Sequence, residues 1–125
     1  MNRSLSNKEK LKSKKLIEQL FTEGKSVSVH PLRLIFIEAS FAEGVKLKVG
    51  VSVSKRNFKK AVDRNRIKRL LRECYRLQKH TYFNNITTQY AFMILYIGND
   101  KPIYKHLETK MKLLFKQFLI KVDKK

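Results

Sequence analysis

The stretch VGVSVSKRNFKKAVDRNRIKRLLRECYR, residues 49–76, joins an alternating strand to a basic helix. Its first part alternates apolar and polar residues, which predicts a strand with one buried face. In its second part the apolar residues recur at helical spacing and fall on one side of a helix over residues 61–80: Ile67, Leu70, Leu71 and Cys74. The opposite side carries a basic row: Asn65, Arg69, Arg72 and Arg76. We therefore expect the apolar side to fix this helix on a sheet while the arginines face solvent.

The basic row has few acids to balance it, because only Asp63 and Glu73 lie within residues 61–76. Like charges on adjacent helical turns repel, so a helix needed only for solubility would mix the signs. The planar arginine fork suits bidentate contacts with phosphate, and the amide of Asn65 can donate to or accept from a ribose hydroxyl or a base edge. The row therefore predicts a polyanionic partner outside the protein.

The remaining sequence predicts a mixed α+β fold around this unit. Leucine spacing indicates a helix over residues 8–21 that the glycine of Glu23–Lys25 ends, and short β-branched runs indicate strands over 25–29, 32–39 and 45–54. A buried strand over 89–98 and a helix over 103–122 follow. The order α-β-β-β-α-β-α, without repeat or linker, predicts a single-domain α-β sandwich over residues 1–125, with helices on a mainly antiparallel sheet.

The composition favours a folded protein that binds nucleic acid. Apolar residues make up 42% of the 125 residues, which is enough for one core. Twenty-nine Lys and Arg against ten Asp and Glu leave a formal charge of +19, and neutralising phosphates releases condensed counterions. An anionic membrane surface is the alternative, but the chain has no Trp and its densest cluster is arginine rather than lysine.

Several classes of function lack the residues they need. Cys74 is a single cysteine on the apolar side of its helix, which predicts a buried, unreactive thiol and a reducing compartment. The acids are dispersed and His30, His80 and His106 are isolated, so we expect no catalytic and no metal-binding residues. Without a signal peptide or an apolar run long enough to cross a bilayer, the predicted location is cytoplasmic.

Residues 49–76 closely resemble the signature of the bacterial ribonuclease P protein subunit, in which a strand ending in Ser-Lys-Lys or similar is followed by A-V-x-R-N-R-x-K-R-x-x-R. The first helix (LKSKKLIEQLFTEGKS), the strand PLRLIFIE and the last helix are also similar to those of the family. Two positions depart from its pattern, since Ile17 replaces a frequent aromatic residue and the loop RNFKK lacks a frequent glycine. The resemblance implies a ribosomal-protein-like fold with a left-handed β-α-β crossover through the basic helix.

The resemblance also implies two binding surfaces. Residues expected to bind the RNA subunit are Lys55, Arg56, Arg64, Asn65, Arg66, Lys68, Arg69, Arg72 and Arg76. A cleft formed by the first helix and the sheet would hold the single-stranded 5′ leader of precursor transfer RNA, with Phe21, Phe36, Ile17 and Arg33 as its candidate lining. Judged by spacing alone, Phe21 and Phe36 are more typical of a core.

The resulting hypothesis is a protein subunit of ribonuclease P that assists removal of the 5′ leader. The RNA subunit would supply the chemistry with Mg²⁺ held through RNA, and the protein alone would bind no cofactor. Its expected partners are the ribonuclease P RNA and precursor tRNA, with no membrane or small-molecule substrate, and we expect a monomer, one per RNA. Two alternatives are a structural RNA-binding protein of ribosomal type and a protein that binds duplex DNA through its basic helix.

Overall fold

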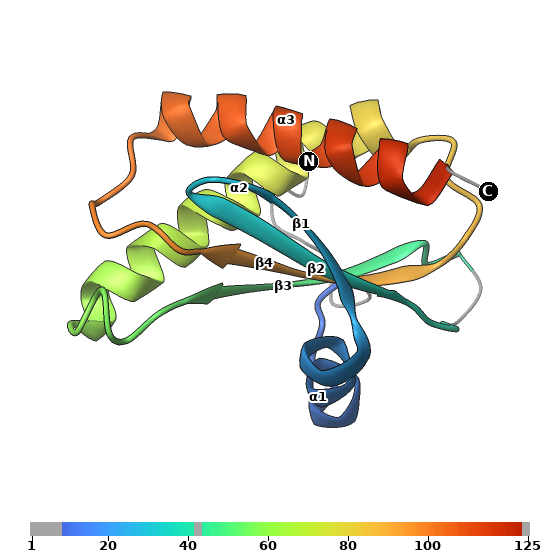
Figure 1. Cartoon of the computed structure of the whole chain (residues 1–125), viewed down its shortest axis with the longest axis horizontal. Coiled ribbons are helices and arrows are strands. Elements are labelled where there is room, and N and C mark those ends of the chain that lie inside the picture. The colour runs from blue at the N-terminus through green and yellow to red at the C-terminus, as the bar shows by residue number, and fades with distance from the viewer. Residues whose placement is uncertain (1–8, 42–43, 124–125) are drawn as a thin grey trace.

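A computed structural model describes residues 9–41 and 44–123 (Figure 1). Seven elements follow one another along the chain: α1 (Lys14–Glu23), β1 (Lys25–Val29), β2 (Leu32–Glu38), β3 (Leu47–Val53), α2 (Ala61–Phe83), β4 (Tyr90–Tyr96) and α3 (Tyr104–Asp123). This is the predicted order α-β-β-β-α-β-α, and the predicted mixed α+β fold is confirmed.

The four strands form one sheet in the order β1-β2-β4-β3. β1 pairs antiparallel with β2, and β2 pairs antiparallel with β4, so the sheet is mainly antiparallel as predicted. β3 and β4 are parallel neighbours joined through α2, which gives the β-α-β crossover expected from the resemblance. Because a parallel connection must return along the sheet, α2 lies against the face of the two strands that it joins.

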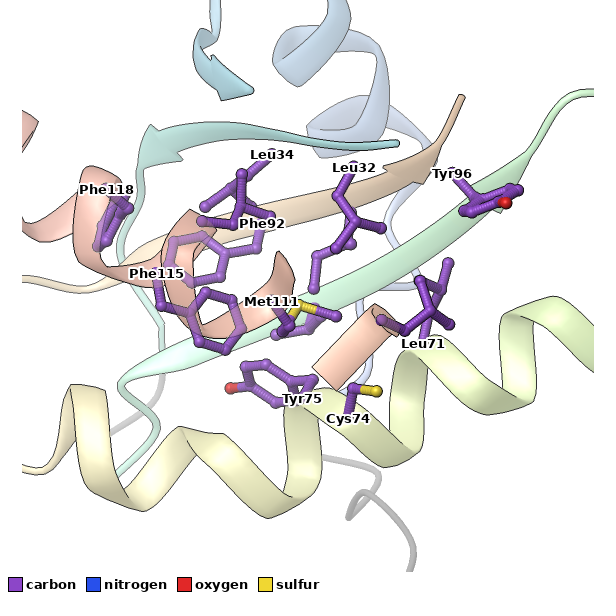
Figure 2. Packing of buried hydrophobic residues seen from close by; sticks show 14 of the residues in the cluster. Leu32, Leu34, Leu71, Cys74, Tyr75, Phe92, Tyr96, Met111, Phe115 and Phe118 are labelled. Carbon is purple, nitrogen blue, oxygen red and sulfur yellow. The ribbon is translucent and has the colours of Figure 1, made fainter. Parts of the chain in front are cut away.

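Helices cover both faces of the sheet. α2 and α3 lie together on one face, and α1 lies alone on the other (Figure 1). The core beneath α2 and α3 is rich in aromatic residues, with Phe92 of β4 packed edge to face on Phe118 of α3 (Figure 2). The core beneath α1 is smaller and contains five buried residues: Leu11, Leu20, Ile35, Ala91 and Met93.

The apolar side of α2 anchors this helix as predicted. Ile67, Leu71 and Cys74 are all at most 2% exposed, and Leu70 is half-buried (Figure 2). Burial, followed by the nearby Glu108 carboxylate, raises the pKa of the Cys74 thiol to about 12, so the thiolate is scarce at neutral pH. The helix continues three residues past the predicted end at His80, because Phe83 is buried against Phe115.

The first helix begins later than predicted, at Lys14 instead of Lys8. Ser13 caps it, since its Oγ accepts a hydrogen bond from the Leu16 N–H at 3.2 Å. Glu9 to Leu11 run extended beside β3, and the bridge pairs Lys10 with Val49 in parallel. We call residues 9–12 the strap. Lys8 lies outside the described residues.

Gly24 ends α1, as predicted, for a reason that spacing does not reveal. Its φ of −68° is open to any residue, so no left-handed turn requires glycine here. A Cβ at Gly24 would instead lie 2.4 Å from the Leu20 carbonyl oxygen and 2.7 Å from Cγ2 of Ile35. Glycine therefore allows the end of α1 to pack directly on β2.

Candidate nucleic-acid interface

Four side chains on the solvent side of α2 are exposed and form what we call the α2 basic face: Asn65, Arg66, Arg69 and Arg72. Among residues 9–41 and 44–123, none of the four forms an ion pair or a side-chain hydrogen bond. The buried apolar side of the helix fixes their backbone positions. Three guanidinium groups and an amide are thus free to bind an anion, as the sequence predicts.

Two predicted interface residues use their guanidinium groups within the protein. Arg64 donates from Nη1 to the carbonyl oxygens of Phe58 and Lys59, both at 2.8 Å. Arg76 makes a two-pronged ion pair with Glu73 one turn earlier, and Nε to Oε2 spans 3.4 Å. The expectation that both side chains face the partner freely is therefore wrong. Arg64 fastens the loop before α2, and Arg76 is neutralised by an acid on its own helix. Lys68 is half-buried at the edge of the row.

The loop from β3 to α2 presents Lys55 and Arg56 to solvent, as expected. The loop is fixed from both ends, because Ser54 Oγ accepts from the Arg56 N–H at 3.1 Å and Asn57 Nδ2 donates to the Gly98 oxygen at 3.2 Å. Phe58 is buried against Tyr96. No described residue other than glycine has a positive φ, so this loop turns without the glycine that is frequent in the family.

A groove of about 590 Å³ runs beside the α2 basic face. Arg69 and Arg72 line one wall, Lys10 and Lys12 of the strap line another, and Ile17 of α1 closes it. Gly50 and Met93 lie in its floor, and the missing side chain of Gly50 leaves the floor low. None of the described lining residues is Asp or Glu, so a single strand entering the groove would meet only cations and apolar surface.

The alternation of β2 assigns its residues to two faces. Ile35 belongs to the core beneath α1, whereas Phe36 is 4% exposed and packs on Phe118 of α3 on the opposite face. The expectation that Phe36 lines a cleft beneath α1 is therefore corrected, because its ring points away from that helix. Ile35 is the β2 residue that faces α1.

Three other cleft candidates do lie on the α1 side of the sheet. Phe21 is 53% exposed and follows Ile17 by one helical turn, so the two form an apolar edge along α1. Arg33 shares the strand face of Ile35, is exposed, and its Nη2 lies 3.4 Å from Oγ of Ser26. An exposed aromatic ring of this kind is typical of a surface on which an unpaired base stacks.

The chemistry that this surface offers is binding rather than proton transfer. Among the described residues, no three His, Cys, Asp or Glu side chains gather where they could hold a metal ion. Burial is the main cause of the raised pKa of Tyr75, whose hydroxyl group lies outside the groove. No helix of the described chain combines the length and apolar character that crossing a bilayer demands.

The sequence matches the family model for ribonuclease P over residues 5–119. The chain belongs to the ribonuclease P protein family. The ribonuclease P protein component of Porphyromonas gingivalis is 37% identical over 112 residues, which cover 86% of this chain and 80% of that protein. The ribonuclease P protein component of Chlorobium phaeobacteroides is 36% identical over 126 residues, which cover 89% and 85%.

Solved structures of ribonuclease P proteins share the fold. The protein from Staphylococcus aureus superimposes with a TM-score of 0.69 over 86% of this chain and 93% of that chain, at 19% identity. The protein from Thermotoga maritima superimposes with a TM-score of 0.67 over 86% and 96%, at 21% identity. A ribonuclease P protein binds the RNA subunit and is part of the holoenzyme that processes tRNA 5′ ends.

Sequence reasoning missed part of the interface of this ribonuclease P protein. The alternation around Val49 and Val51 could have placed Gly50 on the opposite strand face, towards α1. Lys10 and Lys12 left no comparable signal, because their position depends on the strap pairing with β3. Strand pairing between distant segments is not encoded in the local spacing of either one.

Proposed function

We propose that this chain docks on the ribonuclease P RNA through the α2 basic face and holds the 5′ leader of precursor tRNA in the groove beside α1. The main support is a row of unpaired guanidinium groups that continues directly into a groove without acids. Arg69 and Arg72 belong to both surfaces. They would therefore bring the leader close to the RNA subunit.

The two surfaces would make different contributions to binding. The α2 basic face, together with Lys55 and Arg56, would neutralise phosphates of folded RNA, with affinity gained by counterion release. The groove would accept an unpaired strand, because its apolar floor and the exposed ring of Phe21 suit bases that are free to stack. A substrate with a leader would then bind more tightly than the matured product.

We assign the hydrolysis to the RNA subunit. The described part of the protein offers no clustered carboxylates with which to hold Mg²⁺, so the residues do not fit a protein-bound catalytic metal. Mg²⁺ would be held through RNA phosphates, and the cations of the protein would screen the repulsion between leader and RNA subunit. One protein monomer for each RNA would suffice for both contacts.

The test is a reconstituted cleavage assay. Precursor tRNA and ribonuclease P RNA are combined at low Mg²⁺ with and without the full-length protein, and mature 5′ ends are measured over time. We expect the protein to increase cleavage because it restores electrostatic screening that the scarce Mg²⁺ no longer supplies. Tight binding of the RNA with no increase in cleavage would contradict the proposal and would favour a structural RNA-binding protein.

A further inference from the structure

The strap is fastened to the rest of the molecule by three kinds of contact. Its backbone pairs with β3, where the Leu11 N–H donates to the Val49 oxygen at 3.1 Å and the Val49 N–H donates to the Glu9 oxygen at 2.7 Å. Leu11 is buried in the core beneath α1. Lys79 of α2 donates from Nζ to both carboxylate oxygens of Glu9, at 2.6 and 2.8 Å. The strap thus has a fixed place between α1 and α2.

This place brings the two strap lysines to the groove. Lys10 and Lys12 are exposed and line it together with Arg69 and Arg72, which come from the other wall. Glu9 does not line the groove and lies in a separate hollow with Lys79. The strap therefore directs its cations towards the groove while its carboxylate is neutralised elsewhere.

We propose that Lys10 and Lys12 bind phosphates of the single strand in the groove, and that Glu9 and Lys79 are positioning residues that hold the strap in place. This inference rests on the proposed function, because it takes the occupant of the groove to be the leader. Charge complementarity favours RNA as that occupant, since four cations and none of the described acids line the groove. Fixing the strap before binding lowers the entropy cost of ordering two lysines.

The pair of Glu9 and Lys79 has an unusual consequence. A carboxylate close to a polyanion site normally weakens binding, so simple electrostatics predicts that neutralising Glu9 strengthens binding of the leader. If Glu9 holds the strap, its loss releases Lys10 and Lys12 and weakens binding instead. The sign of the change in affinity therefore separates a positioning role from a purely electrostatic one.

The first experiment tests the lysines in the complex reconstituted from full-length protein and ribonuclease P RNA. Dissociation constants for precursor tRNA and for mature tRNA are measured over a range of salt concentrations. Combining Lys10→Gln with Lys12→Gln should weaken precursor binding by about tenfold and flatten its salt dependence by about 1.4, which is about 0.7 for each single-strand phosphate contact. Binding of mature tRNA should not change.

The matched control is Lys112→Gln combined with Lys116→Gln, which removes the same charge from exposed positions of α3 on the other side of the sheet. This control should retain the binding and salt dependence of the wild type for both tRNAs. Equal losses in the two double variants would overturn the assignment of Lys10 and Lys12, because the effect would then depend only on net charge.

The second experiment tests the positioning pair in the same complex. Glu9→Gln should weaken precursor binding by about threefold, in line with a half-exposed ion pair, although it removes a negative charge. Combining Glu9→Lys with Lys79→Glu should restore the wild-type affinity, since the reversed pair keeps both the contact and the net charge. Unchanged or tighter binding by Glu9→Gln would overturn the positioning role.

The wild-type complex separates the proposed leader site from the role of the strap. If it binds precursor and mature tRNA equally, the leader site is wrong, and the inference about the strap is wrong with it. If it prefers the precursor while the strap variants behave as the wild type does, only the inference about the strap is overturned.

Discussion

The two faces of the sheet differ in how completely helices cover them. The face beneath α2 and α3 is closed, and rings from both helices and from β4 interlock there, as Phe115 does with Tyr75 and Phe83 (Figure 2). The face beneath α1 has a single short helix and a small core, and the groove lies beside that helix. The same four strands thus support a packed layer and an open one.

Stability and binding are therefore assigned to opposite faces. The closed face buries large side chains, which are worth the most in area removed from water. The open face leaves Phe21 and the α2 basic face accessible, at the expense of apolar burial. Substitutions on the closed face should change the free energy of unfolding, and those on the open face should change affinity for RNA.

The largest effect is expected from Phe115→Ala on the closed face. Phe115 is fully buried, and its loss leaves a cavity that should lower the free energy of unfolding by about 4 kcal/mol. Met93→Ala in the floor of the groove should cost about 2 kcal/mol, because its surroundings are open enough to relax. Urea titration of both variants measures the difference. Equal losses would remove the contrast between the two faces.

Arg64 and Arg69 should respond in opposite ways to the same substitution. Arg64→Ala removes two hydrogen bonds to the loop before α2 and should lower the free energy of unfolding by about 1.5 kcal/mol. Arg69→Ala should leave it within about 0.5 kcal/mol while weakening binding to ribonuclease P RNA. Thermal unfolding and a binding assay on both proteins check this. A destabilised Arg69→Ala protein would argue against a free guanidinium group.

Phe21→Ala should affect the leader more than the fold. The ring is half-exposed, so the free energy of unfolding should change by less than about 0.5 kcal/mol. Loss of a stacking surface should weaken binding of precursor tRNA to the reconstituted complex by about tenfold. Mature tRNA serves as the control ligand. Equal weakening for the two tRNAs would show that Phe21 does not contact the leader.

The smallest effect is expected from Gly50→Ala in the groove floor. A Cβ at this position would lie 3.0 Å from Cε of Met93, the mobile end of a flexible side chain that can give way. The free energy of unfolding should therefore change by less than about 0.5 kcal/mol. A urea titration that shows a loss above about 2 kcal/mol would mean that the floor is rigid and more closely packed than an open face should be.

The order of the elements and the two sides of α2 could be predicted because local periodicity encodes them. Ile67, Leu71 and Cys74 recur with the period of a helix, and any sheet that they meet will bury them. The basic side of α2 follows by exclusion. Its exposed residues Asn65, Arg69 and Arg72 were therefore identified without knowledge of the tertiary structure.

The remaining features depend on tertiary neighbours that local spacing does not record. Leu34, Ile35 and Phe36 are consecutive and all buried, so alternation separates their faces without indicating which one lies beneath α1. Arg64 and Arg76 have long side chains that turn back onto nearby acceptors, although their positions suggested exposure. The strap could not be predicted because its partner, Val49, is distant in the sequence.

The role of the α2 basic face is best tested by the salt dependence of ribonuclease P RNA binding by the full-length protein with Arg69→Ala and Arg72→Ala combined. If each arginine neutralises one phosphate, the slope of log K against log salt concentration should be shallower by about two, at about 0.9 for each arginine removed. The thermal midpoint should match that of the wild type. A slope and an affinity equal to those of the wild type would contradict the role assigned to the α2 basic face.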